Sequence, residues 1–250
     1  MVPHRFVREP ADPDAALWRY GDLWKLEALL GTGRLYFTRA NRAGDPLEGS
    51  YTVANIDSYR QIMVQLHGQY GQQLVDKLPA WNRAMTGWIY LSCWFMQPHE
   101  SQAMWDGFGK GPAAERVAFR TTIGGLKGSI VDQKEIHLGE IRYIDFATQR
   151  FERGHALPPF LHKAMHLDSE HEVRAIYAHP LPVRYLVDDP PLTSGPEGVE
   201  IAVDLAQLLQ EVVVAPGASV EFRARVQNLT DGAGLHLGVR HSAIDNPPLY

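Results

Sequence analysis

The stretch WIYLSCWFM, residues 88–96, decides which fold class the chain is expected to adopt. It is apolar almost throughout and rich in aromatic residues, which is typical of a buried strand. Other expected strands are mixed with helices, without a regular strand–helix–strand period. We therefore predict an α+β fold in which helices pack on mixed or antiparallel sheets.

The other predicted elements follow from local pattern and capping residues. Asp22 is a plausible N-cap of a short Leu-rich helix that ends at Gly31 or Gly33. Proline residues at the start of 158–169 favour a helix there. Further helices are predicted over 46–86, broken between Gly68 and Gly71, and over 101–108. A short helix is also predicted between 204 and 211, and another helix from after 216 to about Leu229. The predicted strands are 17–20, 34–40, 115–122, 140–148, 172–179, 199–204, 211–216 and 235–241, with a Pro/Gly-rich loop at 188–198.

The length of 250 residues suits one large globular domain or two small ones, and one domain is favoured. We expect residues 1–16 to be a lead-in and 17–250 to form one domain, in which 199–250 could be a C-terminal lobe. The net charge of −5 indicates no general affinity for nucleic acid or anionic membranes. The single cysteine, Cys93, excludes an intrachain disulfide framework. With no signal peptide or membrane-length apolar run visible, the sequence predicts a cytoplasmic protein.

The stretch DSEHEVRAIY, residues 168–177, places two glutamates one residue apart before an apolar segment. In an extended chain Glu170 and Glu172 point the same way, and Glu172 shares a face with Arg174 and Ile176. One interpretation is a solvated strand edge. The other is a partly buried glutamate paired with arginine, which is a candidate for a functional site.

Three further motifs have both a structural and a functional interpretation. Asp45-Pro46-Leu47-Glu48 has the pattern of a capping box, although one of its carboxylates could also face a pocket. Residues 107–111, GFGKG, are expected to be a plain loop, because no phosphate-loop motif is present. Cys93 is expected to be a buried structural thiol.

A metal site is the alternative suggested by histidine spacing. His162, His166 and Glu170 are four residues apart and would share one face of a helix, as zinc ligands do. A solvated helix face explains the same spacing. A metal-dependent hydrolase built on these three residues is therefore kept as an alternative function.

An ordered set of motifs covers residues 17 to about 240. The motifs are LWRY (17–20) before a Leu-rich helix, GRLYFTRANRAGDPLEG (33–49), YLSCWF (90–95), AMWDGF (103–108), Lys163 ahead of EHEVR (170–174), and EVVVAPGA (211–218). In this order they resemble the bacterial family labelled domain of unknown function 2971. The sequence departs from that family's pattern at Gly44, at Phe108 and at His166 or Leu167.

A second resemblance is to ADP-ribosyltransferases of the Arg–Ser–Glu type. Arg19 in the first strand, Ser92 in a middle strand and Glu170-His171-Glu172 before a later strand occur in that order. The resemblance implies an enzyme that uses NAD as co-substrate and needs no metal. Arg19, Ser92 and Glu172 are then expected to converge on one cleft.

The resemblance also implies a role for each residue. Glu172 would stabilise an oxocarbenium-like state, and Ser92 would orient the ribose or the glutamate. Glu170 would position or deprotonate the acceptor, and Arg19 would hold a phosphate. Tyr36 or Phe37 would stack on nicotinamide, and the other residues expected at the NAD site are Asp45, Glu48, Trp105 and Arg174.

The acceptor could be a protein, a nucleic acid or a small molecule, and the oligomeric state is open. A toxin or defence effector is the role this implies. The remaining alternative is a partner-binding module without catalysis, whose polar residues serve only as caps and surface.

Overall fold

The computed structural model describes residues 1–152, 155–180 and 193–246. Within them the chain forms a nine-stranded sheet, a small two-stranded sheet and several helices, which confirms the predicted α+β class. The strands are β1 (Ala16–Asp22), β2 (Arg34–Arg39), β3 (Ile89–Met96), β4 (Arg116–Thr122), β5 (Ile136–Glu140), β6 (Arg142–Ile144), β7 (His162–Ala164), β8 (Glu172–Ala178), β9 (Gly198–Ala202), β10 (Glu211–Val214) and β11 (Val239–His241). The α-helices are α1 (Leu23–Thr32), α2 (Val53–Met85), α3 (Gln102–Gly107), α4 (Ile123–Ser129), α5 (Leu205–Leu208) and α6 (Val220–Gly232).

The predicted buried strand, β3, is the point at which the large sheet forks. On one side β3 pairs antiparallel with β8 from Ile89 to Phe95. The other side is shared: β1 pairs at the end of β3, with Leu17 opposite Met96, and β2 pairs near its start, with Thr38 opposite Leu91. β1 and β2 therefore diverge along the middle of β3.

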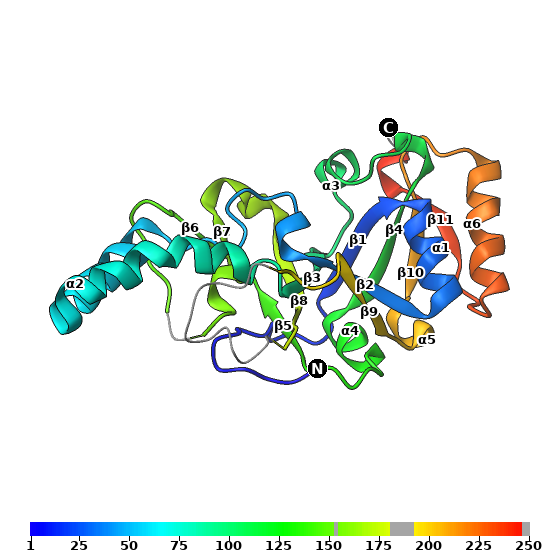
Figure 1. The fold of residues 1–250 in the computed structure, drawn as a ribbon. Helices are drawn as coiled ribbons and strands as arrows, with labels where there is room; N and C mark the ends of the chain where they lie inside the picture. Colours follow the sequence, from blue (N-terminus) through cyan, green and yellow to red (C-terminus); the bar gives the residue numbers. More distant parts are fainter. Residues whose placement is uncertain (153–154, 181–192, 247–250) are drawn as a thin grey trace.

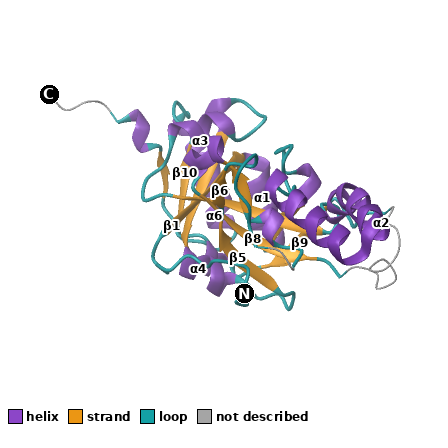
Figure 2. Cartoon of the chain, turned by 90° about the vertical axis from the view of Figure 1, so that its left-hand side faces the viewer, coloured by secondary structure: helices purple, strands orange, loops and turns teal. Residues whose placement is uncertain are grey.

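The sheet continues outward from this fork. Its order is β11-β10-β4-β1-β3-β2-β9, and β8 adds β5 beyond the other edge of β3. Helices α1 and α6 contact each other beside the β10–β4–β1 part, whereas α2 projects from the opposite end of the molecule (Figure 1). Figure 2 shows α4 and the N-terminus close together at one edge. The largest apolar core lies between the sheet and α1, α4 and α6.

The segments at both ends of the chain are tied to this sheet. The Val2 amide donates to the Ile136 carbonyl, and the Glu140 amide donates to the Arg8 carbonyl, so the lead-in lies along β5. Strands β9, β10 and β11 join the same large sheet. In the part of the chain that the structure describes, no helix is long and apolar enough to cross a membrane.

Several predicted elements were wrong in detail. Residues 158–169 do not form one α-helix: a 3-10 turn, the short strand β7 and a second 3-10 turn share the segment. Residues 45–48 form a turn, and the following helix starts at Val53 with Thr52 as its cap. Its predicted break is present as non-helical backbone at Gly68. Residues 188–192 of the predicted loop lie outside the described ranges.

Candidate functional site

A cavity of about 600 Å³ lies at the fork of the sheet. That volume is within the roughly 300–1,000 Å³ of small-molecule sites. Its walls come from β1, β3, β8, the start of α1, the turn after β2 and the segment before β8. The charged residues that line it are Arg19, Lys25, Arg42, Asp45, Glu48, Lys163, Glu170, Glu172 and Arg174, and its aromatic residues are Trp18, Tyr20, Trp94, Phe95 and Phe108.

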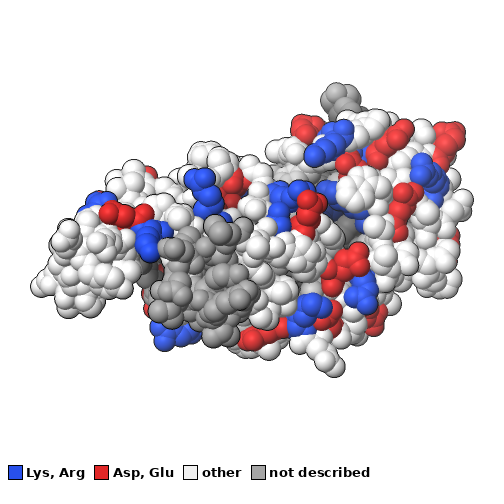
Figure 3. Space-filling view, viewed as in Figure 1, with Lys and Arg blue, Asp and Glu red and all other residues white. Residues whose placement is uncertain are grey.

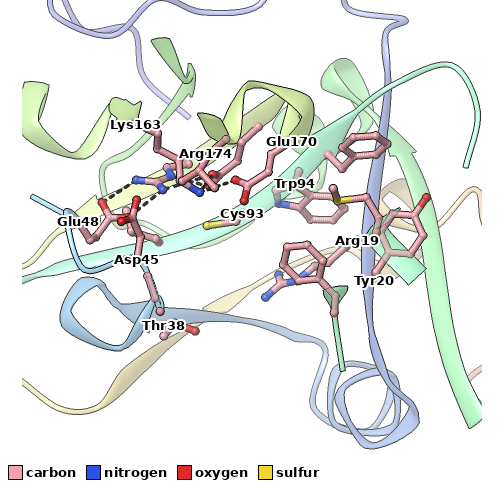
Figure 4. A pocket seen from close by; sticks show the side chains of 18 of the residues that line it. Arg19, Tyr20, Thr38, Asp45, Glu48, Cys93, Trp94, Lys163, Glu170 and Arg174 are labelled. Carbon is pink, nitrogen blue, oxygen red and sulfur yellow. Dashed lines mark hydrogen bonds and ion pairs between the residues drawn. The ribbon is translucent and has the colours of Figure 1, made fainter. Parts of the chain in front are cut away.

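The two ends of this cavity differ in the charged side chains that they carry. Figure 4 shows Glu48, Arg174 and Glu170 together at one end, with Arg19 at the other and Cys93 between them. Lys and Arg side chains also gather near the middle of the face shown in Figure 3. The cavity therefore presents a cationic end and an acid-rich end to a single ligand.

Arg19 spans the gap that the fork opens. Its Nη1 donates to Ser92 Oγ on β3 at 2.8 Å, and its Nη2 donates to the Tyr36 carbonyl on β2 at 3.1 Å. Its guanidinium also lies 5.6 Å from the centroid of the Trp94 ring. Burial lowers the pKa of Arg19 to about 10. Arg19 thus carries a positive charge into the cavity wall, and the two acceptors that hold it, Ser92 Oγ and the Tyr36 carbonyl, are neutral.

A buried ion-pair network forms the acid-rich end. Arg174 contacts both oxygens of Glu48, with Nη1–Oε1 at 2.7 Å and Nη2–Oε2 at 2.9 Å. Its Nε also donates to Glu172 Oε1 at 2.6 Å, and Nη1 donates to the Phe160 carbonyl at 2.8 Å. The predicted pairing of Glu172 with Arg174 is therefore present.

Lys163 extends this network to the second glutamate. Its Nζ lies 3.1 Å from Glu172 Oε2 and also pairs with Glu170. The Glu172 amide donates to Tyr143 Oη at 2.8 Å, which fixes the start of β8. Three carboxylates and two cations thus meet at this end, and Glu170 retains 23% of its side-chain exposure.

The network controls the ionisation of its carboxylates. Burial on its own raises the pKa of Glu172, but Arg174 and Lys163 outweigh it and hold that pKa at about 2. Burial raises the pKa of Glu48, although Arg174 opposes the shift. Burial and the Glu172 carboxylate raise the pKa of the Cys93 thiol well above its ordinary value. Glu172 is therefore a fixed negative charge at neutral pH, whereas Cys93 is a neutral thiol.

Arg19 and Glu172 reach the cavity from opposite faces of the sheet. Trp18 is paired with Phe95, and Phe95 with Glu172, so Glu172 shares a face with Trp18 and not with Arg19. Both nevertheless line the same cavity, because β1 and β2 separate there. The fork brings together two residues that the pleat alone would keep apart.

Other predicted site residues lie elsewhere. Phe37 is fully buried in the main core and does not line the cavity. Tyr36 is half exposed and Trp105 is buried against Tyr20, and neither lines the cavity. Ser92 is fully buried and accepts from Arg19 and Trp94 Nε1, so it supports the wall without lining it.

The predicted metal ligands are also separated. His162 is buried, its Nδ1 lies 2.7 Å from the Pro158 carbonyl, and its ring stacks on Phe151. His166 and Glu170 line the cavity, whereas His162 does not. No group of three metal-ligating side chains occurs among the described residues. The metal prediction depended on a helix over 158–169 that the chain does not form.

The sequence interpretation missed several contributors to the cavity. Lys25, Arg42, Trp94 and Phe108 line it, and none was predicted as a site residue. Asp22 is the N-cap residue of α1, as predicted, but its side chain makes no capping bond. Its carboxylate instead accepts from the amides of residues 110 and 111. The GFGKG stretch contains these two amides, and it was the sequence feature from which this contact with Asp22 could have been predicted.

No family model matches the chain, so the resemblance to domain of unknown function 2971 is not confirmed, and no curated protein matches it either. Similar solved structures are complexes of DarT from Thermus sp. 2.9. The complex with NAD+ has a TM-score of 0.43 and 10% identity, covering 96% of this chain and 100% of that chain. The complex with ADP-ribosylated ssDNA has a TM-score of 0.42 and 12% identity, covering 96% and 98%. These TM-scores are too low to assign an activity.

Proposed function

We propose that the cavity binds NAD and that the protein transfers ADP-ribose from it to an acceptor. The observation that supports this most directly is the charge separation across one cavity, with Arg19 at one end and the ionised Glu172 at the other. NAD carries a negative diphosphate and a ribose on which positive charge develops when the nicotinamide bond breaks. The two ends of the cavity match these two parts.

The cationic end would bind the diphosphate. A guanidinium offers several N–H donors in a fixed plane and forms strong charge-assisted bonds to phosphate oxygens. Arg19 donates to Ser92 and to the Tyr36 carbonyl, which are both neutral acceptors. These bonds orient the guanidinium plane without neutralising its positive charge. Ser92 is thus a positioning residue for Arg19 in this proposal.

The acid-rich end would act on the ribose. The C–N bond to nicotinamide breaks with its electron pair leaving on the nicotinamide nitrogen, and the ribose carbon becomes oxocarbenium-like. A carboxylate already ionised and held in place stabilises that charge without reorganising. Glu172 meets this requirement because Arg174 and Lys163 fix both of its oxygens.

Transfer is completed when an acceptor nucleophile bonds to the ribose carbon and gives up its proton. Glu170 is the proposed base, because it lines the cavity and remains partly exposed. Phe108, whose side chain is exposed at the cavity, is the proposed stacking partner for a ligand ring, in place of Phe37.

Binding of NAD can be tested separately from the chemistry. We expect NAD to raise the melting temperature of the wild-type protein, because a ligand that binds only the folded state stabilises it. Arg19→Met should abolish the shift, whereas Arg34→Met, which removes an exposed arginine of β2 outside the cavity, should keep it. An equal shift of the melting temperature in all three proteins would show that Arg19 does not contribute to NAD binding.

A further inference from the structure

Lys25 lies beside Arg19 because residue 21 has no side chain. A Cβ placed on Gly21 would be 3.1 Å from Lys25 Cδ and 3.6 Å from its Nζ, so the lysine side chain runs over the backbone of β1. Arg19 and Gly21 are two positions apart on that strand and share a face. The ammonium therefore occupies the space that a side chain at position 21 would fill, on the face of β1 that carries Arg19, and the Arg19 charge acts on it.

Within the part of the chain that the structure describes, neither cation is paired with a carboxylate. Among the described residues, no Asp or Glu oxygen lies within 4.0 Å of the Arg19 or Lys25 side-chain nitrogens. The carboxylate of Asp22 acts on Lys25 at longer range. Its oxygens accept instead from the Lys110 amide at 3.0 Å and the Gly111 amide at 2.9 Å.

The two charges therefore repel each other at one end of the cavity. The Lys25 side chain is exposed overall, but protein around its ammonium and the charge of Arg19 lower its pKa. The side chain of Lys110 adds a third positive charge that acts in the same direction. Placing like charges together costs free energy, and a bound anion would recover it.

We infer that Arg19 and Lys25 form a site for a diphosphate, and that the cavity selects ligands with two linked phosphate groups over those with one. Two adjacent cations match the two linked phosphates, each of which carries negative charge, whereas a monophosphate can satisfy only one of them well. The assignment of NAD as the ligand rests on the proposed function. The preference for a diphosphate does not require that NAD be cleaved.

The test is the affinity for ADP and AMP, measured by titration calorimetry on the full chain at fixed ionic strength. We expect wild type to bind ADP about tenfold or more tightly than AMP, because one additional charged hydrogen bond is worth roughly that factor. Lys25→Met should lose most of this difference. Lys127→Met is the matched control, since it makes the same change at a lysine of α4 that lies outside the cavity.

A second variant tests how Lys25 is placed. Gly21→Val leaves the lysine in the chain but fills the space its stem occupies, and the valine suits a strand. It should keep the wild-type melting temperature and weaken ADP binding as Lys25→Met does. Equal affinity of wild type and Lys25→Met for ADP, equal affinity of wild type for ADP and AMP, or no ADP binding would each overturn the inference.

The inference and the proposed function fail in different ways. NAD cleavage that is unchanged in Lys25→Met would contradict the proposed diphosphate site but not the proposed transferase activity. Lys25-dependent ADP binding by a protein that does not cleave NAD would support the diphosphate site and contradict the proposed transferase activity.

Discussion

Arg174 and Glu48, 126 positions apart in the sequence, form a two-point ion pair whose side chains are 1% and 3% exposed. The pair ties the turn after β2 to strand β8. Because Arg174 also holds Glu172, this turn determines the position of the proposed catalytic carboxylate. The stability of the fold and the geometry of the site therefore depend on the same contacts.

Glu48→Gln is expected to destabilise the protein strongly. It removes one of the two carboxylates that neutralise Arg174, and breaking a buried pair in this way typically costs about 3–5 kcal/mol. Urea unfolding measures the change. Glu27→Gln is the control, because its partner Arg225 is 59% exposed and such pairs are worth at most about 1 kcal/mol. Equal effects from the two changes would contradict the role given to the buried pair.

Gly49→Ala tests the packing beneath the same turn. Gly49 has a φ of 74°, and a Cβ there would lie 2.7 Å from Phe160 Cε1 and 2.9 Å from Thr86 Cγ2. Gly217 has nearly the same φ, 73°, but open space around it, so Gly217→Ala reports backbone strain alone, about 1–2 kcal/mol. We expect Gly49→Ala to lose about 1–3 kcal/mol more by overpacking. The same melting temperature for both variants would show that the turn is not tightly packed.

Stability should fall in acid because of Glu172. Its pKa is held at about 2 in the folded protein, below the ordinary 4.5 of the unfolded chain. The unfolded state therefore binds more protons in this range, and the stabilisation present above pH 4.5 is lost as pH falls towards 2. Glu48, whose pKa is raised, opposes this slope. Glu172→Gln should flatten the dependence of unfolding free energy on pH between 4.5 and 2; an unchanged slope would show that Glu172 is not held ionised.

Ser92→Ala should weaken NAD binding in addition to lowering stability. It leaves Arg19 Nη1 and the buried Trp94 Nε1 without their acceptor, at a cost of roughly 1–3 kcal/mol. Ser129→Ala, at a fully buried serine of α4 away from the cavity, should lower the melting temperature without changing NAD affinity. If both variants bind NAD as wild type does, Ser92 does not position Arg19.

The fold class was predictable because local runs of apolar and aromatic residues indicate the strands β3, β4, β8 and β10. The failure at 158–169 has a physical cause. Prolines at the start suit a helix, but this segment is held by contacts with residues outside it, including the pairing of β7 with β6 and the ion pair of Lys163 with Glu172. Local pattern carries no information about such contacts.

Part of the site was predictable for the same reason. The alternation of Glu172 and Arg174 on one strand is a local property, and their pairing followed from it. The fork at β3 is not local, because it depends on which strands share an edge. Lys25 shows what the sequence alone does not reveal. Its place in a helix indicates an ordinary exposed residue, and only its position over Gly21 brings it to the face of β1 that carries Arg19.

The most direct test of the central claim is nicotinamide release from NAD by purified wild type and by Glu172→Gln, each shown to be folded by its melting curve. Glu170→Gln, at the more exposed carboxylate, serves as a second variant if the first does not fold. We expect release by wild type and its loss in Glu172→Gln. Release that is the same in both proteins, or no release together with no NAD-induced change in the wild-type melting temperature, would contradict it.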